Sequence, residues 1–373
     1  MVVLGAGFAG LELATCLDEA LGDEVHVTVI DESESFVFGF SKLDVLFGRT
    51  NLSDVRSFYS EISKKNVDFR CETITAIDAV ARRVDTDAGS HDADFLVVAL
   101  GAAYDFSATP GFEQGGYEYY SVAGAQVLRD ALEGFGGGRV HIAILGEPYK
   151  CPPAPFEGAL LLHDAFEQRG IRDKVEISMS GYMGAPVPVS EEVSSTILGA
   201  LTEHNITYIP KTTVTRLDVE NRVAETDTGQ PISYDLFIGI PVHRVPDVVV
   251  ASGLAPDGWI PVDKENLRTS FADVYAVGDV AGVPMAKAGV FAMNAARVAA
   301  ADIESKVRGS SPPEPYAGAG SCYIEFGGGA VAKVEANFLS GPTPTGHIFG
   351  PSLELAREKK AFADEQRKRW FGS

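Results

Sequence analysis

The chain has 373 residues, of which 45% are hydrophobic, so it is long enough for two or three domains with a sizeable buried core. Its net charge of −21 argues against a nucleic-acid-binding protein, because phosphate neutralisation requires clustered lysines and arginines. The sequence contains no long apolar run, no positively charged secretion signal and no CxxC pair among its four cysteines, so we expect a cytoplasmic protein without a disulfide scaffold or a metal site.

The first thirty residues predict a strand, a glycine-rich turn, a helix and a second strand. Apolar residues 2–4 lead into the motif Gly5-x-Gly7-x-x-Gly10, and a second apolar stretch ends at Asp31, 31 − 5 = 26 positions after the first glycine. Gly5 permits the tight turn, Gly7 lets the backbone approach a pyrophosphate, and Gly10 allows the helix to lie close to the strand. The pattern predicts a dinucleotide-binding site with Asp31 at its edge.

Two further apolar strands end in small residues and indicate which dinucleotide is bound. Residues 94–102 contain Ala99 and Gly101, and residues 274–280 contain the pair Gly278 and Asp279. Both segments resemble secondary fingerprints of the flavoproteins with two dinucleotide domains. That resemblance implies that the first segment closes over the nucleotide, that Asp279 binds the ribityl chain, and that the cofactor is FAD. A helix cap is the structural alternative for Asp279.

A second α/β unit lies between these segments. Glycine-rich residues 134–138 are read as a turn or linker, and they precede a predicted strand at 140–145, a helix at 159–169 and a strand at 174–179. We therefore predict an α/β fold with two Rossmann-like domains and a small C-terminal region. The predicted FAD-binding domain comprises residues 1–105 and 255–310, the inserted domain residues 106–254, and the C-terminal region residues 311–373.

The loop GEPYKCPPAPFE, residues 146–157, stands where the inserted domain would carry its own nucleotide loop. Of the expected glycines only Gly146 is present, and prolines at 152, 153 and 155 remove backbone N–H donors. Glu147 would repel a pyrophosphate. We therefore expect NADH to bind poorly or not at all.

The same loop places Cys151 just before a predicted helix N-terminus, where the dipole and free N–H groups should lower its pKa and favour the thiolate. A single cysteine in a loop is often inert. Cys322, in the stretch GAGSCYIEFG at 318–327, offers a second thiol 322 − 151 = 171 residues downstream.

These motifs together resemble the sulfide:quinone oxidoreductase and flavocytochrome c sulfide dehydrogenase group along essentially the whole chain. The resemblance rests on the order of the FAD fingerprint, KCPPAPFE, VGD, the triplet at 287–289, SCYIEFG and FLSGPTPTG. It implies that Cys151 and Cys322 form a redox disulfide over the flavin. Sulfide would attack this disulfide, leaving a persulfide on Cys322 and a thiolate on Cys151 that passes two electrons through the flavin C4a, with quinone as the final acceptor.

The chain departs from the group's pattern at two places. Residues 72–150 contain no third catalytic cysteine, and Cys16 and Cys71 are expected to be small buried hydrophobes. Residues 36–47 contain no cysteine, so FAD is expected to be held noncovalently. Rival functions are the flavoprotein subunit of a sulfide dehydrogenase, with a cytochrome acceptor, and an NADH:quinone oxidoreductase.

Two further residues have a functional and a structural interpretation. Glu157, at the start of the helix after Cys151, could move protons or simply complement the helix dipole. Lys287 could lie beside the flavin or the quinone, where a cation stabilises the reduced anionic flavin, or it could be solvated.

Residues 353–371 predict a C-terminal helix with Leu355, Phe362 and Trp370 near one face. Six basic and four acidic side chains between 354 and 370 give it a net charge of 6 − 4 = +2. Such a helix could lie on the inner face of the cell membrane and give access to quinone, or it could cap its own domain. The sequence leaves an oligomer possible.

Overall fold

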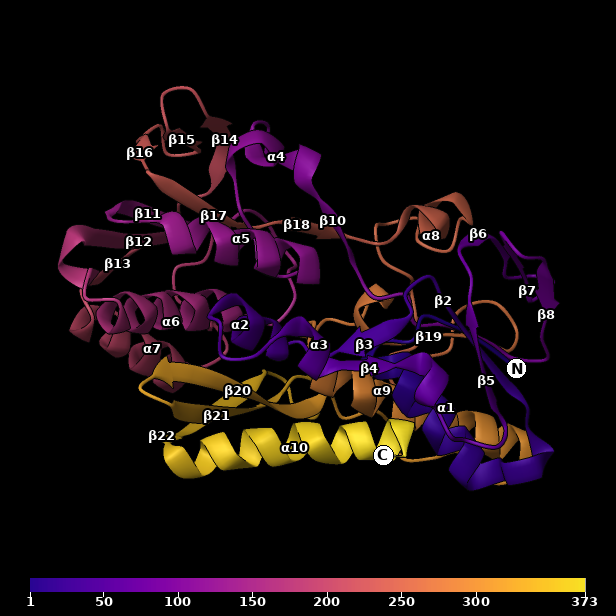
Figure 1. The fold of residues 1–373 in the computed structure, drawn as a ribbon. Coiled ribbons are helices and arrows are strands. Elements are labelled where there is room, and N and C mark those ends of the chain that lie inside the picture. The colour runs from indigo at the N-terminus through magenta and orange to yellow at the C-terminus, as the bar shows by residue number, and fades with distance from the viewer. Residues whose placement is uncertain (373) are drawn as a thin grey trace.

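The computed structural model describes residues 1–372, and the glycine motif belongs to a five-stranded parallel sheet of order β19-β9-β1-β2-β5. Its strands are β1 (Val2–Leu4), β2 (Val27–Asp31), β5 (Val67–Cys71), β9 (Leu96–Val98) and β19 (Val274–Ala276). Helices α1 (Phe8–Leu21) and α9 (Gly289–Arg308) pack side by side on this sheet (Figure 1). Strands β1, β9 and β19 are buried throughout, as expected for parallel strands covered on both faces.

A second parallel sheet, of order β13-β12-β11-β17, forms the other lobe. Its strands are β11 (Gly138–Ile144), β12 (Val175–Gly181), β13 (Ile206–Pro210) and β17 (Leu236–Ile240), and the helices are α5 (Val122–Gly134), α6 (Ala154–Gln168) and α7 (Glu191–Glu203). Two details differ from the sequence-based prediction. The glycine-rich stretch ends α5 and begins β11 rather than forming a linker, and α6 begins five residues earlier than predicted, because prolines fit the first helical turn.

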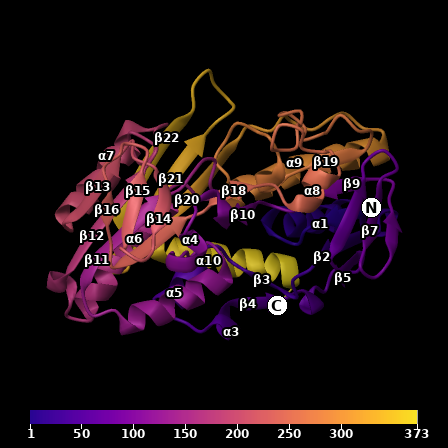
Figure 2. The same ribbon diagram turned by 90° about the horizontal axis from the view of Figure 1, so that it is seen from above.

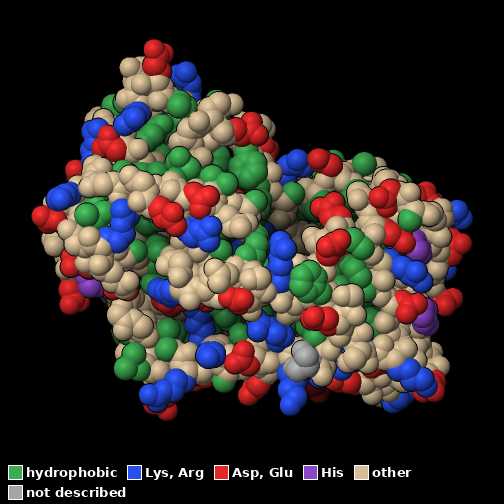
Figure 3. All heavy atoms as spheres, viewed as in Figure 1, with side chains coloured by type: hydrophobic (Ala, Val, Ile, Leu, Met, Phe, Trp, Pro, Cys, Tyr) green, Lys and Arg blue, Asp and Glu red, His purple; other side chains and the backbone are tan. Residues whose placement is uncertain are grey.

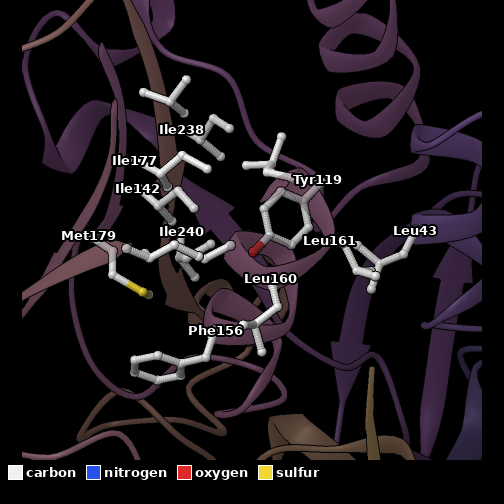
Figure 4. Close-up of a cluster of buried hydrophobic side chains, with 14 of the residues drawn as sticks. Leu43, Tyr119, Ile142, Phe156, Leu160, Leu161, Ile177, Met179, Ile238 and Ile240 are labelled. Carbon is white, nitrogen blue, oxygen red and sulfur yellow. The ribbon is translucent and has the colours of Figure 1, made fainter. Parts of the chain in front are cut away.

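Helix α6 is fixed by apolar contacts along nearly its whole length. Phe156, Leu160 and Leu161 lie on α6 and pack in one cluster with Ile142 and Ile238 of the sheet (Figure 4). Each of these side chains is no more than 1% exposed. The first turn of α6, which follows Cys151, is therefore held rigidly by the core.

The remaining elements are shorter. Two strands cross between the lobes as an antiparallel pair, β10 (Ala103–Asp105) and β18 (Val242–Arg244). The others are β3 (Ser35–Val37), α2 (Ser41–Leu46), α3 (Leu52–Val55), β4 (Arg56–Phe58), β6 (Ile74–Asp78), β7 (Arg83–Thr86), β8 (Ser90–Asp92), α4 (Phe112–Gly115), β14 (Val214–Asp218), β15 (Val223–Thr226), β16 (Ile232–Ser233) and α8 (Asp247–Ala251).

The C-terminal part is an antiparallel sheet of β20 (Ala319–Gly327), β21 (Ala330–Asn337) and β22 (Thr345–Ser352), followed by α10 (Leu353–Phe371). Figures 1 and 2 show α10 running under this sheet and on toward α1. The Ser352 hydroxyl caps its first turn and Gly372 ends it in the left-handed conformation.

The apolar face of α10 packs on the protein itself. Trp370 and Phe371 are each 1% exposed, and Phe362 contacts the rings of Phe38 and Tyr323. Of the two sequence-based interpretations, the capping helix therefore describes these side chains. No helix within residues 1–372 combines the length and apolarity needed to cross a bilayer.

The surface view in Figure 3 shows acidic and basic side chains interspersed, with a hollow between the two lobes.

One sequence-based expectation about the cysteines is wrong. Cys71 is exposed rather than buried, because it ends β5 at the edge of the sheet. Cys16 is half-buried beside Glu12, and burial raises its pKa to about 11.

Candidate active site

One cavity of about 310 Å³ brings together most of the residues singled out in the sequence. The segments that line it are the starts of α1, α6 and α9, together with α2 and β20. The predicted site residues on its wall are Gly7, Ala99, Gly101, Cys151, Glu157, Gly278, Asp279 and Cys322. The predicted dinucleotide loop and the two predicted redox thiols therefore face the same space.

The glycine motif has the close approaches that its pattern predicts. Gly5 has a φ of +98°, and a Cβ there would lie 2.5 Å from the Ala99 oxygen. A Cβ on Gly10 would lie 1.9 Å from the Gly5 oxygen, so helix and turn touch at this point. A Cβ on Gly7 would meet no atom within 4 Å, because Gly7 faces the cavity. This open space beside the start of α1 fits the pyrophosphate of a dinucleotide.

We expect Gly7→Ala to fold normally and to lose FAD affinity roughly ten- to a hundredfold, since its methyl group would occupy space the pyrophosphate needs and no protein atom opposes it. Equilibrium titration of the apoprotein with FAD, followed by protein fluorescence, measures this. Gly199→Ala, on the exposed side of α7, is the matched control and should bind FAD as the parent does.

The other predicted cofactor residues flank this loop. The Asp31 carboxylate accepts the N–H of Ala6 at 2.7 Å and lies at the end of β2, outside the cavity wall. Asp279 lies in the short 3₁₀ helix Gly278–Val280 that follows β19. Burial raises its pKa, opposed by the charges of Lys150, Lys287 and Lys42.

Lys287 is buried, so the solvated interpretation of this residue is wrong. Its ammonium donates to the backbone oxygens of Asp279 and Ala281 and lies 3.6 Å from the ring centroid of Trp259. Burial lowers its pKa to about 8. The Lys287 carbonyl accepts the N–H of Cys151 at 2.6 Å, so this segment also positions the loop that carries the thiol.

Cys151 is held in a backbone conformation that side chains rarely adopt. Its φ is +49°, which costs on the order of 1–3 kcal/mol. The surroundings fix it there: its N–H bonds to Lys287, and its carbonyl accepts the Ala154 N–H at 2.9 Å and the Tyr120 hydroxyl at 3.5 Å. In this conformation the loop lines the cavity with Lys150 and Cys151.

The predicted low pKa of Cys151 is wrong for the isolated chain. Burial raises the pKa of the Cys151 thiol well above its usual value, and Cys322 and Glu157 raise it further. The Ala154 N–H at the start of α6 does favour the thiolate, as does Lys42, but burial is the larger effect. Burial likewise raises the pKa of Cys322 to about 12. Both cysteines are free thiols in the structure.

Glu157 joins the cavity to a buried ionic cluster. Its Oε1 accepts the N–H of Glu325 at 2.9 Å and lies 3.9 Å from the Lys359 ammonium. Lys359 in turn lies 2.6 Å from Glu325, which also pairs with Arg49. Burial raises the pKa of Glu157 to about 7, with Lys359 opposing this shift. The helix dipole alone would have lowered it.

The site includes two lysines that the sequence analysis did not single out. Lys42, from α2, and Lys150, next to Cys151, both line the cavity. Lys42 donates to the Tyr120 carbonyl, and Lys150 donates to the Ala102 carbonyl at 3.2 Å. The position of Lys150 beside Cys151 was a usable signal, whereas nothing in the sequence connected Lys42 to the motifs.

The turn before α6 has little capacity to bind a second nucleotide. The Ala154 N–H is bonded to Cys151, residue 155 is a proline, and the Phe156 and Glu157 N–H groups bond to the Pro153 carbonyl. Tyr149 is 3% exposed and fills the core beneath the loop. Strand β12 ends in Gly181 and is followed by Tyr182, so it lacks the acidic residue that binds a ribose in NAD sites.

Comparison with known families gives a match over most of the chain. Residues 1–151 and 155–301 match the pyridine nucleotide-disulphide oxidoreductase family. This match confirms the predicted α/β fold with two dinucleotide-type units and FAD as the cofactor. Among curated proteins, type II NADH:quinone oxidoreductase of Staphylococcus aureus is 32% identical over 135 residues, which are 36% of this chain and 34% of that protein. The alignment thus spans about a third of the relative's length.

Solved structures share the fold over nearly the whole chain. The sulfide:quinone oxidoreductase of Aquifex aeolicus superposes with a TM-score of 0.88 at 21% identity, covering 99% of this chain and 91% of that one. A structure of NDH2 from Plasmodium falciparum in complex with NADH gives a TM-score of 0.76 at 14% identity, covering 99% and 96%. A sulfide:quinone oxidoreductase and an NDH2 bound to NADH therefore share this fold, so the fold alone does not identify the electron donor.

Proposed function

This chain belongs to the pyridine nucleotide-disulphide oxidoreductase family, and from that premise we propose that it is an FAD-dependent sulfide:quinone oxidoreductase with Cys151 and Cys322 as its redox pair. The observation that carries the proposal is that both cysteines line one cavity with Gly7 and Asp279 of the cofactor site. Two thiols from distant parts of the chain, converging where the cofactor binds, support thiol-disulfide chemistry coupled to flavin reduction.

The proposed reaction begins with the cysteines as a disulfide. Hydrosulfide attacks the sulfur of Cys322, the S–S bond breaks, and its electron pair leaves on Cys151 as a thiolate. A second hydrosulfide takes the outer sulfur of the Cys322 persulfide as HS–SH and leaves a second thiolate. FAD held beside Gly7 and Asp279 would supply the two-electron acceptor for the return of the two thiolates to a disulfide, with a quinone and two protons as the final acceptor.

We place Glu157 in this reaction as the base that takes the proton of the departing HS–SH, which then leaves as HSS⁻. The Glu157 pKa of about 7 suits proton transfer near neutrality, and the Lys359 and Glu325 side chains connect it to Arg49 at the surface. Acting as a base, Glu157 must be ionised, so flavin reduction should accelerate as the pH rises through about 7.

We expect Glu157→Gln to remove this acceleration and to slow flavin reduction roughly 10²-fold above neutral pH. Hydrosulfide titrates as well, but that ionisation persists in the variant, so the difference between the two pH–rate profiles isolates Glu157. Stopped-flow measurement of flavin bleaching from pH 5.5 to about 9 tests this. Parallel profiles for the parent and the variant would exclude Glu157 as the base.

The second candidate function is NADH:quinone oxidation, which the curated sequence match favours. Two observations disfavour NADH binding. The N–H groups at the start of α6 are already bonded within the protein, and β12 ends without an acidic residue. One experiment separates the two functions: the flavin absorbance of the anaerobic holoprotein is recorded after sulfide, and in a separate sample after NADH. We expect sulfide to bleach the flavin, a soluble quinone to restore it, and NADH to leave it oxidised. Rapid bleaching by NADH but not by sulfide would reverse the assignment.

A flavoprotein subunit with a cytochrome acceptor is tested in the same samples. Reoxidation of the sulfide-reduced flavin by cytochrome c, but not by quinone, would favour that acceptor.

A further inference from the structure

Two lysines on the cavity wall are not paired with the carboxylates that line the same cavity, Asp279 and Glu157. Lys42 and Lys150 line this cavity. Lys287 lines a neighbouring pocket, and Asp279 lies on the wall of both. The two carboxylates whose charges act on Lys42 and Lys150 are Asp279 and Glu118. Lys287 bonds to backbone oxygens rather than to either carboxylate. The ionic cluster at Glu157 pairs its three carboxylates, Glu157, Glu325 and Asp44, with Lys359 and Arg49 and not with the cavity lysines.

The two cavity lysines are not paired with carboxylates. Within residues 1–372 neither Lys42 nor Lys150 has a carboxylate oxygen within 4.0 Å, and the hydrogen bond of each ammonium goes to a backbone carbonyl. Both lysines are half-buried, and a half-buried cation held only by neutral partners favours an anion as its remaining neighbour. The whole protein carries a net charge of −21, so these two unpaired cations are a local feature of the site.

A frame of two tyrosines fixes both lysines beside Cys151. The Tyr120 carbonyl accepts both the Lys42 ammonium and the Tyr104 hydroxyl, the latter at 2.9 Å. The Lys150 ammonium lies 4.3 Å from the Tyr104 ring centroid. The Tyr120 hydroxyl reaches the Cys151 carbonyl at 3.5 Å. Lys42 and Cys151 are also close enough for each to favour the charged form of the other.

We propose that Lys42 and Lys150 form an anion subsite beside Cys151, which binds the incoming sulfur nucleophile as the monoanion and then holds the negative charge of the Cys151 thiolate. The inference rests on the proposed function for its substrate, a small monoanionic sulfur nucleophile such as hydrosulfide. The two ammonium groups serve both stages, because one negative charge enters with hydrosulfide and one remains on Cys151 after the S–S bond breaks. The neutral molecule H₂S would gain nothing from the two ammonium groups.

The first test is the sulfide dependence of flavin bleaching in the anaerobic holoprotein. We expect Lys42→Met and Lys150→Met each to raise the half-saturating sulfide concentration about tenfold, and Lys42→Arg to restore most of the loss. Lys360→Met, on the exposed side of α10, changes the net charge equally and should leave the half-saturating concentration unchanged. Equal half-saturating concentrations in Lys42→Met, Lys150→Met and Lys360→Met would overturn the subsite.

The second test does not depend on sulfide turnover. In a Cys322→Ser background, iodoacetamide alkylation of Cys151 is followed against pH by mass spectrometry, which reports the pKa of that thiol. Lys42→Met should raise this pKa by about one unit or more, whereas Lys360→Met should not change it. Glu157, the other charged side chain that acts on Cys151, is the same in both proteins.

The two tests separate failure of the subsite from failure of the proposed function. If sulfide does not bleach the flavin of the parent protein, the proposed function is wrong, and the alkylation profiles still decide whether Lys42 stabilises an anion at Cys151. If sulfide bleaches the parent and neither measurement distinguishes Lys42→Met from Lys360→Met, the function stands and the subsite is wrong.

Discussion

Replacing either Cys151 or Cys322 by serine is expected to reduce the rate of sulfide-dependent flavin reduction by at least about 10³-fold. A serine hydroxyl can neither form a disulfide nor leave as a stabilised thiolate, so the S–S bond that hydrosulfide must break does not exist in either variant. FAD loading should be unchanged, because the glycine loop and Asp279 remain in place. Anaerobic stopped-flow bleaching measures the rate, and the absorbance ratio of flavin to protein measures the loading.

Cys71→Ser is the matched control. Cys71 is exposed at the edge of β5 and does not line the cavity, so its loss should leave the rate within about twofold of the parent. If Cys151→Ser and Cys322→Ser retained the rate of Cys71→Ser, the redox pair would be refuted. A loss of rate in only one of them would show that a single thiol carries the chemistry, and the disulfide mechanism would be wrong.

The sequence analysis agrees with the structure where the geometry is local in the chain. The glycine motif combines a tight turn, an open approach and a close helix contact within six residues, and Gly5, Gly7 and Gly10 each have the surroundings that this pattern predicts. The placement of Cys322 was of a different kind. It lies on β20, which packs on α6, and family resemblance rather than spacing connected it to Cys151 across 171 residues.

The errors have a common physical origin, which is burial that depends on tertiary packing. The helix N-terminus after Cys151 favours a low pKa, but burial of the thiol outweighs it. For Glu157 the helix dipole and burial also oppose each other, and burial again prevails. Cys71 alternates with Val67 and Phe69 on a strand that lies at a sheet edge, where its side chain is exposed. Lys42 belongs to no motif, and only the fold brings α2 to the cavity.

The second large effect is expected from Trp370→Ala, which should lower the free energy of unfolding by about 3–5 kcal/mol. The indole is 1% exposed, stacks on Phe38 with ring centroids 5.7 Å apart, and meets Phe36 edge-on at 5.4 Å. Its N–H donates to Glu12 at 2.7 Å, and Glu12 lies on α1 directly after the glycine motif. The variant therefore loses apolar contacts and one partner of a buried carboxylate at the same place.

Denaturant unfolding measures the loss as a lower midpoint with an unchanged slope, and the same coupling to α1 should weaken FAD binding. Leu353→Ala is the control, since Leu353 begins the same helix and is 60% exposed, so its removal should cost less than about 0.5 kcal/mol.

The comparison also distinguishes two roles of α10, stabilising the fold and binding a lipid surface. A helix whose aromatic end served chiefly to bind a lipid surface would lose vesicle binding in Trp370→Ala while its unfolding midpoint stayed that of the parent. The buried indole and its bond to Glu12 predict the opposite: an early unfolding transition with no change in vesicle binding.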